Sequence, residues 1–218
     1  MTAEAPGPPR YRAILALDIE GSTARTNTAK AQLRAVMYRL LEEALSAGGI
    51  TECLRDPLVD RGDGVLALIR PADEAPKTAL LNPVIPVLSR LLSVHSAQFP
   101  ELGFRLRAVI HAGEIHFDSR GCFGEALDVA FRLLDAPAVK EKLELVAGPV
   151  VLVVSDEIYQ RVVKHGYDGI DGTHFESLVR VSVGGTAHSG WVHVPDDVPR
   201  AGSDVIPFFP RLARSSPH

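Results

Sequence analysis

The chain has 218 residues, of which 46% are hydrophobic and 23% are charged. These values are typical of a globular protein with a real core, and the length suits one α/β domain rather than two. The formal net charge of −4 gives no general attraction to nucleic acid or to acidic membranes, so we expect neither as a partner. Any phosphate-binding site must then be local, or carried by a metal.

The cysteines and the chain ends indicate a cytoplasmic protein. Only two cysteines occur, Cys53 and Cys122, without the spacing of a metal site, which favours a reduced protein. No signal-peptide pattern opens the chain and no apolar stretch approaches transmembrane length, so we expect no membrane insertion. The composition predicts a disordered start over residues 1–10, a catalytic domain over 11–195 and a flexible tail over 196–218.

The first half of the chain alternates apolar runs with turn sequences. Residues 11–19 are predicted to form a buried strand, and apolar residues at helical spacing predict a helix that begins near residue 29 and ends before Gly48. Two strands, 51–60 and 64–70, are expected to meet at a tight turn over residues 61–64. A second helix is predicted over residues 77–98, with an irregular start caused by Pro83 and Pro86.

The second half mixes strands and helices without strict β-α-β alternation. The predicted strands are 104–117, interrupted near Gly113, then 150–154, 175–183 and 191–194, and the predicted helices are 125–134 and 158–164. We interpret Ser155 as the N-cap of the last helix rather than as a catalytic serine. This order of elements favours an α+β sandwich with a mostly antiparallel sheet over a doubly wound parallel sheet.

A segment of small polar residues follows the first predicted strand at Asp18. A carboxylate at a strand end, beside free backbone N–H groups, suits a metal-bound triphosphate, because the carboxylate binds the cation and the amides bind phosphate oxygens. A strand-ending acid that merely caps the next turn gives the same pattern, and short motifs match often by chance.

A second carboxylate lies in the sequence Gly62-Asp63-Gly64, at the predicted turn between two strands. Asp-Gly is a favoured hairpin turn and needs no function. If the turn projects Asp63 towards Asp18, the two carboxylates repel each other unless a cation lies between them.

The predicted helix 125–134 carries Asp128 and Arg132, which are four residues apart and therefore share one face. One interpretation is a surface ion pair worth only about 0.3–0.5 kcal/mol. The other is an arginine presented to the charge that develops on a phosphoryl group.

In their order and combination these segments resemble the catalytic domain of class III adenylate/guanylate cyclases over roughly residues 12–195. The first metal segment of that family is similar to residues 18–23, its metal-bearing hairpin to 61–64, its strand before the catalytic half to 107–114 and its catalytic helix to 124–133. The resemblance implies the class III cyclase fold, a ferredoxin-like α+β sandwich.

The resemblance also implies the roles of individual residues. Asp18 and Asp63 would hold two Mg²⁺ or Mn²⁺ ions per site, with the Ile19 carbonyl assisting. Asp128 stands where the family has the ribose-orienting asparagine, and Arg132 would stabilise charge on the α-phosphate. The triphosphate would bind along the first segment, at Ile19, Glu20, Gly21, Ser22 and Thr23. In the family the metal carboxylates and the arginine come from different protomers, so a head-to-tail homodimer is implied.

Base selection departs from the family pattern. The purine-selecting lysine of adenylate cyclases is Val59 here, and its partner aspartate is Gly121. In the family, a lysine near the end of the domain usually binds the outer phosphates. The corresponding position falls within residues 183–186, where no cationic residue occurs. The lost purine selectors are compatible with a pyrimidine substrate, UTP or CTP, as used by similar cyclases of some bacterial defence systems.

Two functions follow from this pattern. The first is a nucleotide cyclase that converts a nucleoside triphosphate into a 3′,5′-cyclic nucleotide and pyrophosphate by two-metal catalysis at shared homodimer sites. The second is a catalytically silent module of the same fold that binds a nucleotide, or only dimerises, in a regulatory role. The two acids and Arg132 favour the enzyme, whereas Asp128 and the missing late lysine favour the silent module.

Overall fold

The computed structural model describes residues 7–195. The tail predicted for 196–218, and the first six residues of the predicted disordered start, lie outside the described residues. The strands are β1 (Arg10–Ile19), β2 (Val59–Asp60), β3 (Gly64–Ile69), β4 (Leu106–Asp118), β5 (Gly121–Phe123), β6 (Val150–Ser155), β7 (Glu176–Val183) and β8 (Thr186–His193).

These strands form one sheet in the order β2-β3-β1-β4-β6-β8-β7, with β5 paired to β4 outside this path. Every adjacent pair is antiparallel except β4 and β6, which run parallel. The predicted fold class, a mostly antiparallel α+β sandwich, is therefore confirmed.

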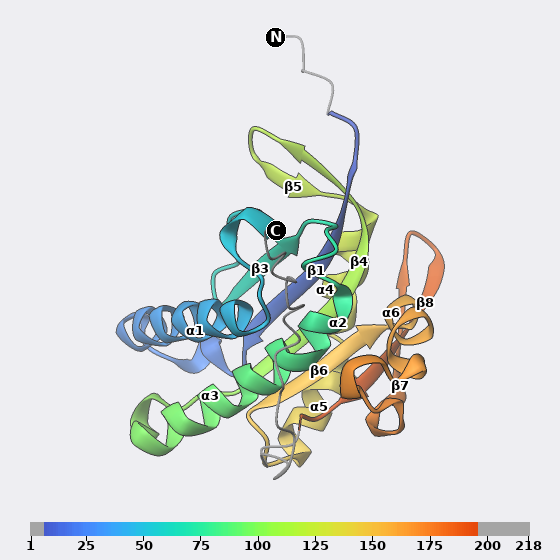
Figure 1. The fold of residues 1–218 in the computed structure, drawn as a ribbon. Helices are drawn as coiled ribbons and strands as arrows, with labels where there is room; N and C mark the ends of the chain where they lie inside the picture. The colour runs from blue at the N-terminus through green and yellow to red at the C-terminus, as the bar shows by residue number, and fades with distance from the viewer. Residues whose placement is uncertain (1–6, 196–218) are drawn as a thin grey trace, which may run out of the picture.

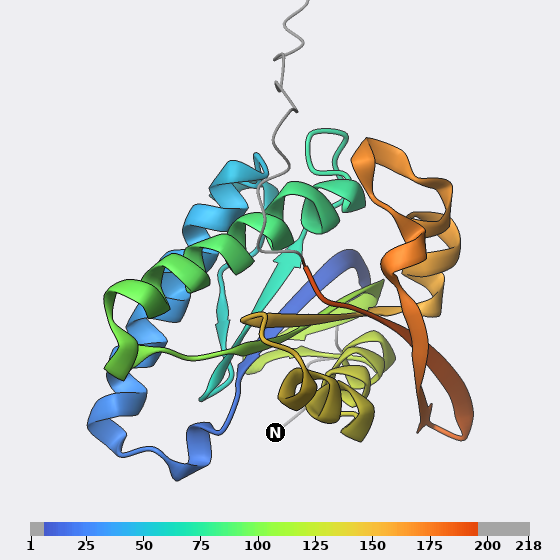
Figure 2. The same ribbon diagram turned by 90° about the horizontal axis from the view of Figure 1, so that it is seen from below.

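Helices cover both faces of the sheet (Figures 1 and 2). They are α1 (Asn27–Ala47), α2 (Lys77–Ala79), α3 (Ile85–Gln98), α4 (Glu125–Leu134), α5 (Pro137–Leu145) and α6 (Asp156–Arg161). In Figure 2, α1 and α3 lie on one side of the sheet, and α4 and α5 lie on the other. Within the part of the chain that the structure describes, no helix combines the length and the apolar character needed to cross a bilayer.

The two-sided cover explains why β1 is apolar at nearly every position. Leu15 and Leu17 point to the core under α1 and α3, whereas Ile14 and Ala16 point to the core under α4 and α5. A strand with helices on both faces is buried on both faces and cannot alternate apolar with polar residues. Asp18 is the only acid of this strand; it is half-buried, and Ile19 after it is again buried in the core under α1 and α3.

Most predicted elements are confirmed, including helix 125–134 and the irregular start of helix 77–98. That start is a π-helical turn over Leu80–Val84 which contains Pro83 and in which Asn82 has non-helical dihedral angles. The structure also contains α5 and β5, for which the sequence reading had no element.

Two predictions are wrong, and the last predicted strand, 191–194, begins too late, because β8 starts at Thr186. Residues 51–58 are not a strand: a 3₁₀ turn occupies Glu52–Leu54, Arg55 forms only an isolated bridge with Ile69, and the β2 ladder begins at Val59, after Pro57, whose missing N–H cannot join a ladder. β4 is also not interrupted near Gly113. A Cβ at Gly113 would lie 2.7 Å from the Cβ of Ala126, so this glycine permits close packing of α4 on a continuous strand.

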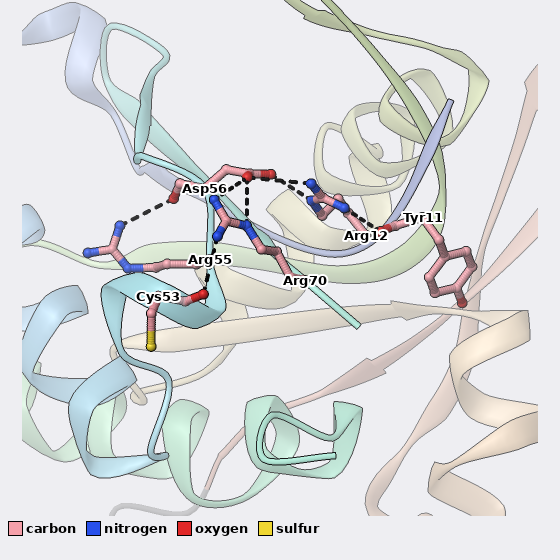
Figure 3. A network of polar contacts seen from close by, with 6 residues as sticks. All are labelled: Tyr11, Arg12, Cys53, Arg55, Asp56 and Arg70. Carbon is pink, nitrogen blue, oxygen red and sulfur yellow. Dashed lines mark hydrogen bonds and ion pairs between the residues drawn. The ribbon is translucent and has the colours of Figure 1, made fainter. Parts of the chain in front are cut away.

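An ion-pair network holds the segment before β2 against the ends of β1 and β3 (Figure 3). Asp56 lies at its centre: Arg12 Nε donates to its Oδ2 at 2.6 Å, and Arg70 Nη2 lies 3.0 Å from its Oδ1. Burial by itself raises the pKa of Asp56, but the hydrogen bonds from Arg12 and Arg70 outweigh it, and the pKa is lowered. The ionised carboxylate therefore stabilises the fold.

We predict that Asp56→Asn lowers the free energy of unfolding by about 3 kcal/mol at pH 7, because Arg12, with 8% of its side chain exposed, loses its charged partner. Since the folded-state pKa is depressed, this stabilisation is present above the unfolded pKa of about 4 and is lost as the pH falls through the folded value. Urea denaturation at pH 7 and pH 3 measures the effect. The exposed Asp73→Asn variant is the control. If Asp56→Asn lowered the free energy of unfolding by the same amount at both pH values, the prediction would be contradicted.

Candidate active site

The backbone brings Asp18 and Asp63 to one corner of the sheet. Asp18 pairs with Gly64 of β3 on one side and with Arg107 of β4 on the other. The N–H of Ile19 then donates to the carbonyl of Asp63 at 3.1 Å, which fixes the hairpin turn beside the end of β1. The two predicted carboxylates thus come from segments held together by main-chain hydrogen bonds.

The glycines on either side of Asp63 have structural reasons of their own. Gly62 has a φ of 80°, in the left-handed region that side chains disfavour. A Cβ at Gly64 would lie 2.4 Å from the carbonyl oxygen of Leu17, so the two strands could not approach as they do. The carboxylate of Asp63 accepts a hydrogen bond from the hydroxyl of Ser22, and therefore faces the loop that follows β1.

The surroundings of Asp18 shift its pKa in opposite directions. Burial raises its pKa, the charge of Arg107 and a close ion pair with that residue lower it, and the charges of Asp63 and Asp135 raise it; the net shift is upward. The side chains of Asp18 and Arg107 are 19% and 12% exposed. Because the charge of Asp63 acts on Asp18, the two carboxylates are electrostatic neighbours.

This donor set fits a divalent cation such as Mg²⁺ or Mn²⁺. Both acids offer hard carboxylate oxygens, and Mg²⁺ is commonly bound through one or two carboxylates together with substrate phosphates and water. Among residues 7–195, no cluster of three or more His, Cys, Asp or Glu side chains could hold a metal ion. An ion at this corner would therefore depend on Asp18 and Asp63, with further oxygens from the main chain, water or a ligand.

The loop after β1 has free hydrogen-bond donors. The N–H groups of Gly21, Ser22 and Thr23 find no acceptor among the described residues. Ile19, Ser22 and Thr23 line a cavity of about 500 Å³ together with Asp63. Three of the five residues predicted to bind a triphosphate therefore share one cavity with a predicted metal ligand.

Glu20 points elsewhere. Its carboxylate accepts two hydrogen bonds from the Arg105 guanidinium, at 2.8 and 2.7 Å, and Arg105 also donates to the carbonyl of Leu143. This side chain ties the end of β1 to the end of α5. Only its main chain, which donates to the Arg105 carbonyl at 3.0 Å, adjoins the candidate site.

Asp128 and Arg132 of α4 are both exposed, and within residues 7–195 neither has an ion pair or a side-chain hydrogen bond. The surface ion pair between them is thus not formed. The groups whose charges act on Asp18 are Arg107, Asp63 and Asp135, and Arg132 is not one of them. Within residues 7–195, no ion pair or hydrogen bond joins the predicted catalytic arginine to the predicted metal ligands.

The residues at the family's base-selecting positions adjoin a mostly apolar wall formed by Val59, Cys122 and Phe131. Val59 is half-buried and packs against the same core as Cys122 and Phe131. The guanidinium of Arg61 lies over the ring of Phe131, 4.0 Å from its centroid, while Gly121 is exposed at the start of β5. Arg61 is thus the cation at this wall, although the sequence reading assigned it no role.

A larger cavity, of about 640 Å³, lies beside the N-terminal half of α4. Here Ser155 Oγ accepts from the N–H of Ile158, which confirms the predicted helix cap, and lies 2.8 Å from His111 Nδ1. Burial lowers the pKa of His111 to about 4, with a smaller contribution from His188. An imidazole with this pKa is a poor base near neutral pH, so we do not interpret the pair as a nucleophile and its base.

Comparison with known proteins supports the fold directly. No family model matches the chain, and no curated protein matches it. Solved structures do match. They include an adenylate/guanylate cyclase/hydrolase from Silicibacter pomeroyi, which is 22% identical with a TM-score of 0.62 over 87% of this chain and 99% of that one.

Two further structures agree. The adenylyl cyclase CyaB from P. aeruginosa is 14% identical, with a TM-score of 0.60 over 89% of this chain and 98% of that one. The catalytic core of a rhodopsin-guanylyl cyclase in complex with ATPαS is 13% identical, with a TM-score of 0.57 over 87% and 99%. The chain therefore has the fold of class III adenylate and guanylate cyclase catalytic domains, as its residues predicted, in a divergent sequence.

We predict that the protein binds Mn²⁺ and that Asp63→Asn weakens this binding by about tenfold or more, equivalent to 1.4 kcal/mol, because one of two carboxylates is lost. Electron paramagnetic resonance of free Mn²⁺ measures the affinity. The exposed Asp73→Asn removes the same charge away from the site and should leave the affinity unchanged. Equal affinities for the two variants would contradict a cation site at Asp63.

Proposed function

We propose that this protein is a nucleotide cyclase, which converts a nucleoside triphosphate into a 3′,5′-cyclic nucleotide and pyrophosphate at sites shared by two copies of the chain. One observation carries the proposal. Main-chain pairing joins the segments of Asp18 and Asp63 at the end of β1, the charge of Asp63 acts on Asp18, and the adjoining loop has N–H groups with no acceptor among the described residues. The similarity to solved structures that are named as cyclases supports it.

In the proposed reaction the ribose 3′-oxygen attacks the α-phosphorus of the same nucleotide. A bond forms between these atoms, the bond from the α-phosphorus to the bridging oxygen of pyrophosphate breaks, and the hydroxyl proton leaves to solvent. Bound Mg²⁺ or Mn²⁺, two ions per site, would lower the pKa of the hydroxyl and neutralise phosphate charge.

The chain itself would mainly position and stabilise the substrate. Asp18 and Asp63, with the Ile19 carbonyl, would hold the cations, and the amides of Ser22 and Thr23 would bind phosphate oxygens. Arg132 would stabilise the charge that grows on the α-phosphate, and Asp128 would accept a hydrogen bond from the ribose.

We propose a head-to-tail homodimer as the active form. Arg132 is exposed, has no partner within residues 7–195, and is not among the groups whose charges act on Asp18. A second copy, related by a two-fold axis, would bring its Arg132 to the carboxylates of the first and receive the same in return. One chain alone would hold two half-sites.

We further propose a pyrimidine substrate, UTP or CTP. Val59 and Gly121 supply neither the lysine nor the aspartate that select adenine in the resembling enzymes. The polar group at this wall, Arg61, has donors and no acceptor. Such a group suits the carbonyl oxygens of a pyrimidine better than the amino group of adenine, which is itself a donor.

A catalytically silent module of the same fold is the second candidate. The observation that favours it is the close ion pair between Asp18 and Arg107, because this arginine competes with a cation for the carboxylate. Asp128 favours it too, since a carboxylate in place of the family's asparagine brings negative charge towards the phosphates. Such a module would bind the nucleotide and leave it unchanged.

We predict that incubation with the four ribonucleoside triphosphates and Mn²⁺ yields cyclic products from UTP or CTP, detected by mass spectrometry. Asp18→Ala and Arg132→Ala should each lower turnover by about 10²–10³-fold, because the first removes a ligand of the cations and the second removes the positive charge that would stabilise the α-phosphate. Arg39→Ala, at an exposed position on α1, serves as the control. If none of the four nucleotides gave a cyclic product, the silent module would be the remaining candidate. If ATP were turned over far better than UTP and CTP, the pyrimidine preference would be refuted.

A mixing experiment tests the shared sites. Asp63→Ala protomers and Arg132→Ala protomers should each be inactive, but half of the dimers in a mixture are mixed, and each of these has one intact site. Equal mixing should therefore restore about a quarter of wild-type activity. A mixture that stays as inactive as either variant would show that one chain does not complete the site of another.

A further inference from the structure

The cavity beside Asp63 contains more positive charge than the sequence reading assigned to it. Its wall includes three cationic side chains, Arg25, Lys30 and Arg34, and two carboxylates, Asp60 and Asp63. Arg25 follows η1 (Ser22–Ala24), and the other two cations lie on the first two turns of α1. The hairpin and the start of α1 thus both line the cavity.

One of the three cations is already paired. Arg34 donates two hydrogen bonds to the carboxylate of Asp60, at 2.8 and 2.7 Å. The pKa of Arg34 is raised, chiefly by its hydrogen bonding to Asp60. Because Asp60 Oδ1 also accepts from the N–H of Gly62 at 2.8 Å, this ion pair fastens the hairpin turn to α1. It therefore adds little net charge to the cavity.

The other two cations have no carboxylate partner within the described residues. Arg25 donates to the carbonyl of Gly103 at 3.2 Å, which leaves its charge uncompensated. Lys30 is half-buried, and no ion pair or hydrogen bond involves its ammonium group in residues 7–195. A partly buried ammonium without a partner is unfavourable, and an anion in the cavity would satisfy it.

The same cavity lies next to donors of a second kind. The N–H groups of Ser22 and Thr23, which have no acceptor among the described residues, share its wall with Lys30 and Arg25. Asp63, where a divalent cation would attach, lines the same cavity. The cavity of about 500 Å³ thus has in its wall two cations without a carboxylate partner among the described residues, amides without an acceptor there, and the carboxylate of Asp63. These groups suit a short chain of phosphates better than a single phosphate.

We infer that Lys30 and Arg25 bind the outer phosphates of the substrate, from the same chain that supplies Asp18 and Asp63. The inference rests on the proposed function. It adds positively charged contacts to the outer phosphates, which none of the predicted site residues provides. It also accounts for the lack of a cation at residues 183–186, where Gly184 and Gly185 form the turn between β7 and β8. Each chain would then bind the triphosphate alone, and its partner would contribute only the groups of α4.

Binding of tripolyphosphate in the presence of Mn²⁺, followed by calorimetry, tests this inference without turnover. Lys30→Gln should weaken binding about tenfold and Lys30→Gln/Arg25→Gln still more, because each removes a charged contact to phosphate. Lys30→Arg, which keeps the charge, should retain most of the affinity. Arg39→Gln is the matched control: it removes one exposed positive charge from the same helix, away from the cavity, and should stay within about twofold of wild type.

A second measurement separates phosphate binding from metal binding. Lys30→Gln should leave the affinity for Mn²⁺ alone unchanged, whereas Asp63→Asn should weaken both. If wild type does not bind tripolyphosphate, or if Lys30→Gln binds it as Arg39→Gln does, the inference is overturned, even when the wild type makes cyclic products. If tripolyphosphate binding depends on Lys30 but no cyclic product forms, the inference stands and the cyclase proposal fails.

Discussion

The position of β1 between β3 and β4 is the constraint on which the candidate site depends. Antiparallel pairing on both sides places Asp18 opposite Gly64 and Arg107, and the bond from the Ile19 N–H to the Asp63 carbonyl extends this register into the hairpin turn. A slip of one residue would turn Asp18 to the other face of the sheet. Gly64 permits the pairing because a side chain there would collide with the Leu17 carbonyl.

The electrostatics of the corner follow from this register. Two carboxylates brought together repel each other, and the Asp18 pKa reflects both their proximity and the burial of the site. Arg107 partly compensates the charge of Asp18, whereas in residues 7–195 the carboxylate of Asp63 accepts a hydrogen bond from Ser22 and has no cationic partner. The corner therefore offers hard oxygen donors of the kind that a divalent cation prefers.

The distribution of charged side chains indicates which groups of the proposed site each of two chains would supply. Arg34 and Asp60 neutralise each other while they fasten the hairpin to α1, and Lys30 and Arg25, which have no carboxylate partner among the described residues, share the cavity with Asp63. Arg132 lies exposed on α4, on the opposite face of the sheet from α1 (Figure 2). One chain thus gathers the groups that suit a metal-bound triphosphate, and a second copy would supply the arginine for the transition state.

The sequence by itself determined the fold class and the local elements on which the candidate residues lie. The apolar run that ends at Asp18, the turn at Gly62-Asp63-Gly64 and the helix with Asp128 and Arg132 are local patterns, and each occurs in the structure where its spacing predicts it. Local patterns failed where a contact distant in sequence decides the backbone. Gly113 reads as a break but permits close packing of Ala126, and residues 51–58 read as a strand but are held by side chains around Asp56.

Only the tertiary structure decided which charges meet. Arg107 lies 89 residues from Asp18, Arg34 lies 26 residues from Asp60, and His111 lies 44 residues from Ser155, so no spacing in the sequence connects them. Strand register and helix packing set these pairs, and both are properties of the assembled sheet. The same assembly leaves Lys30 without a carboxylate among the described residues. Whether a cation is free or paired depends on neighbours that the chain acquires only on folding.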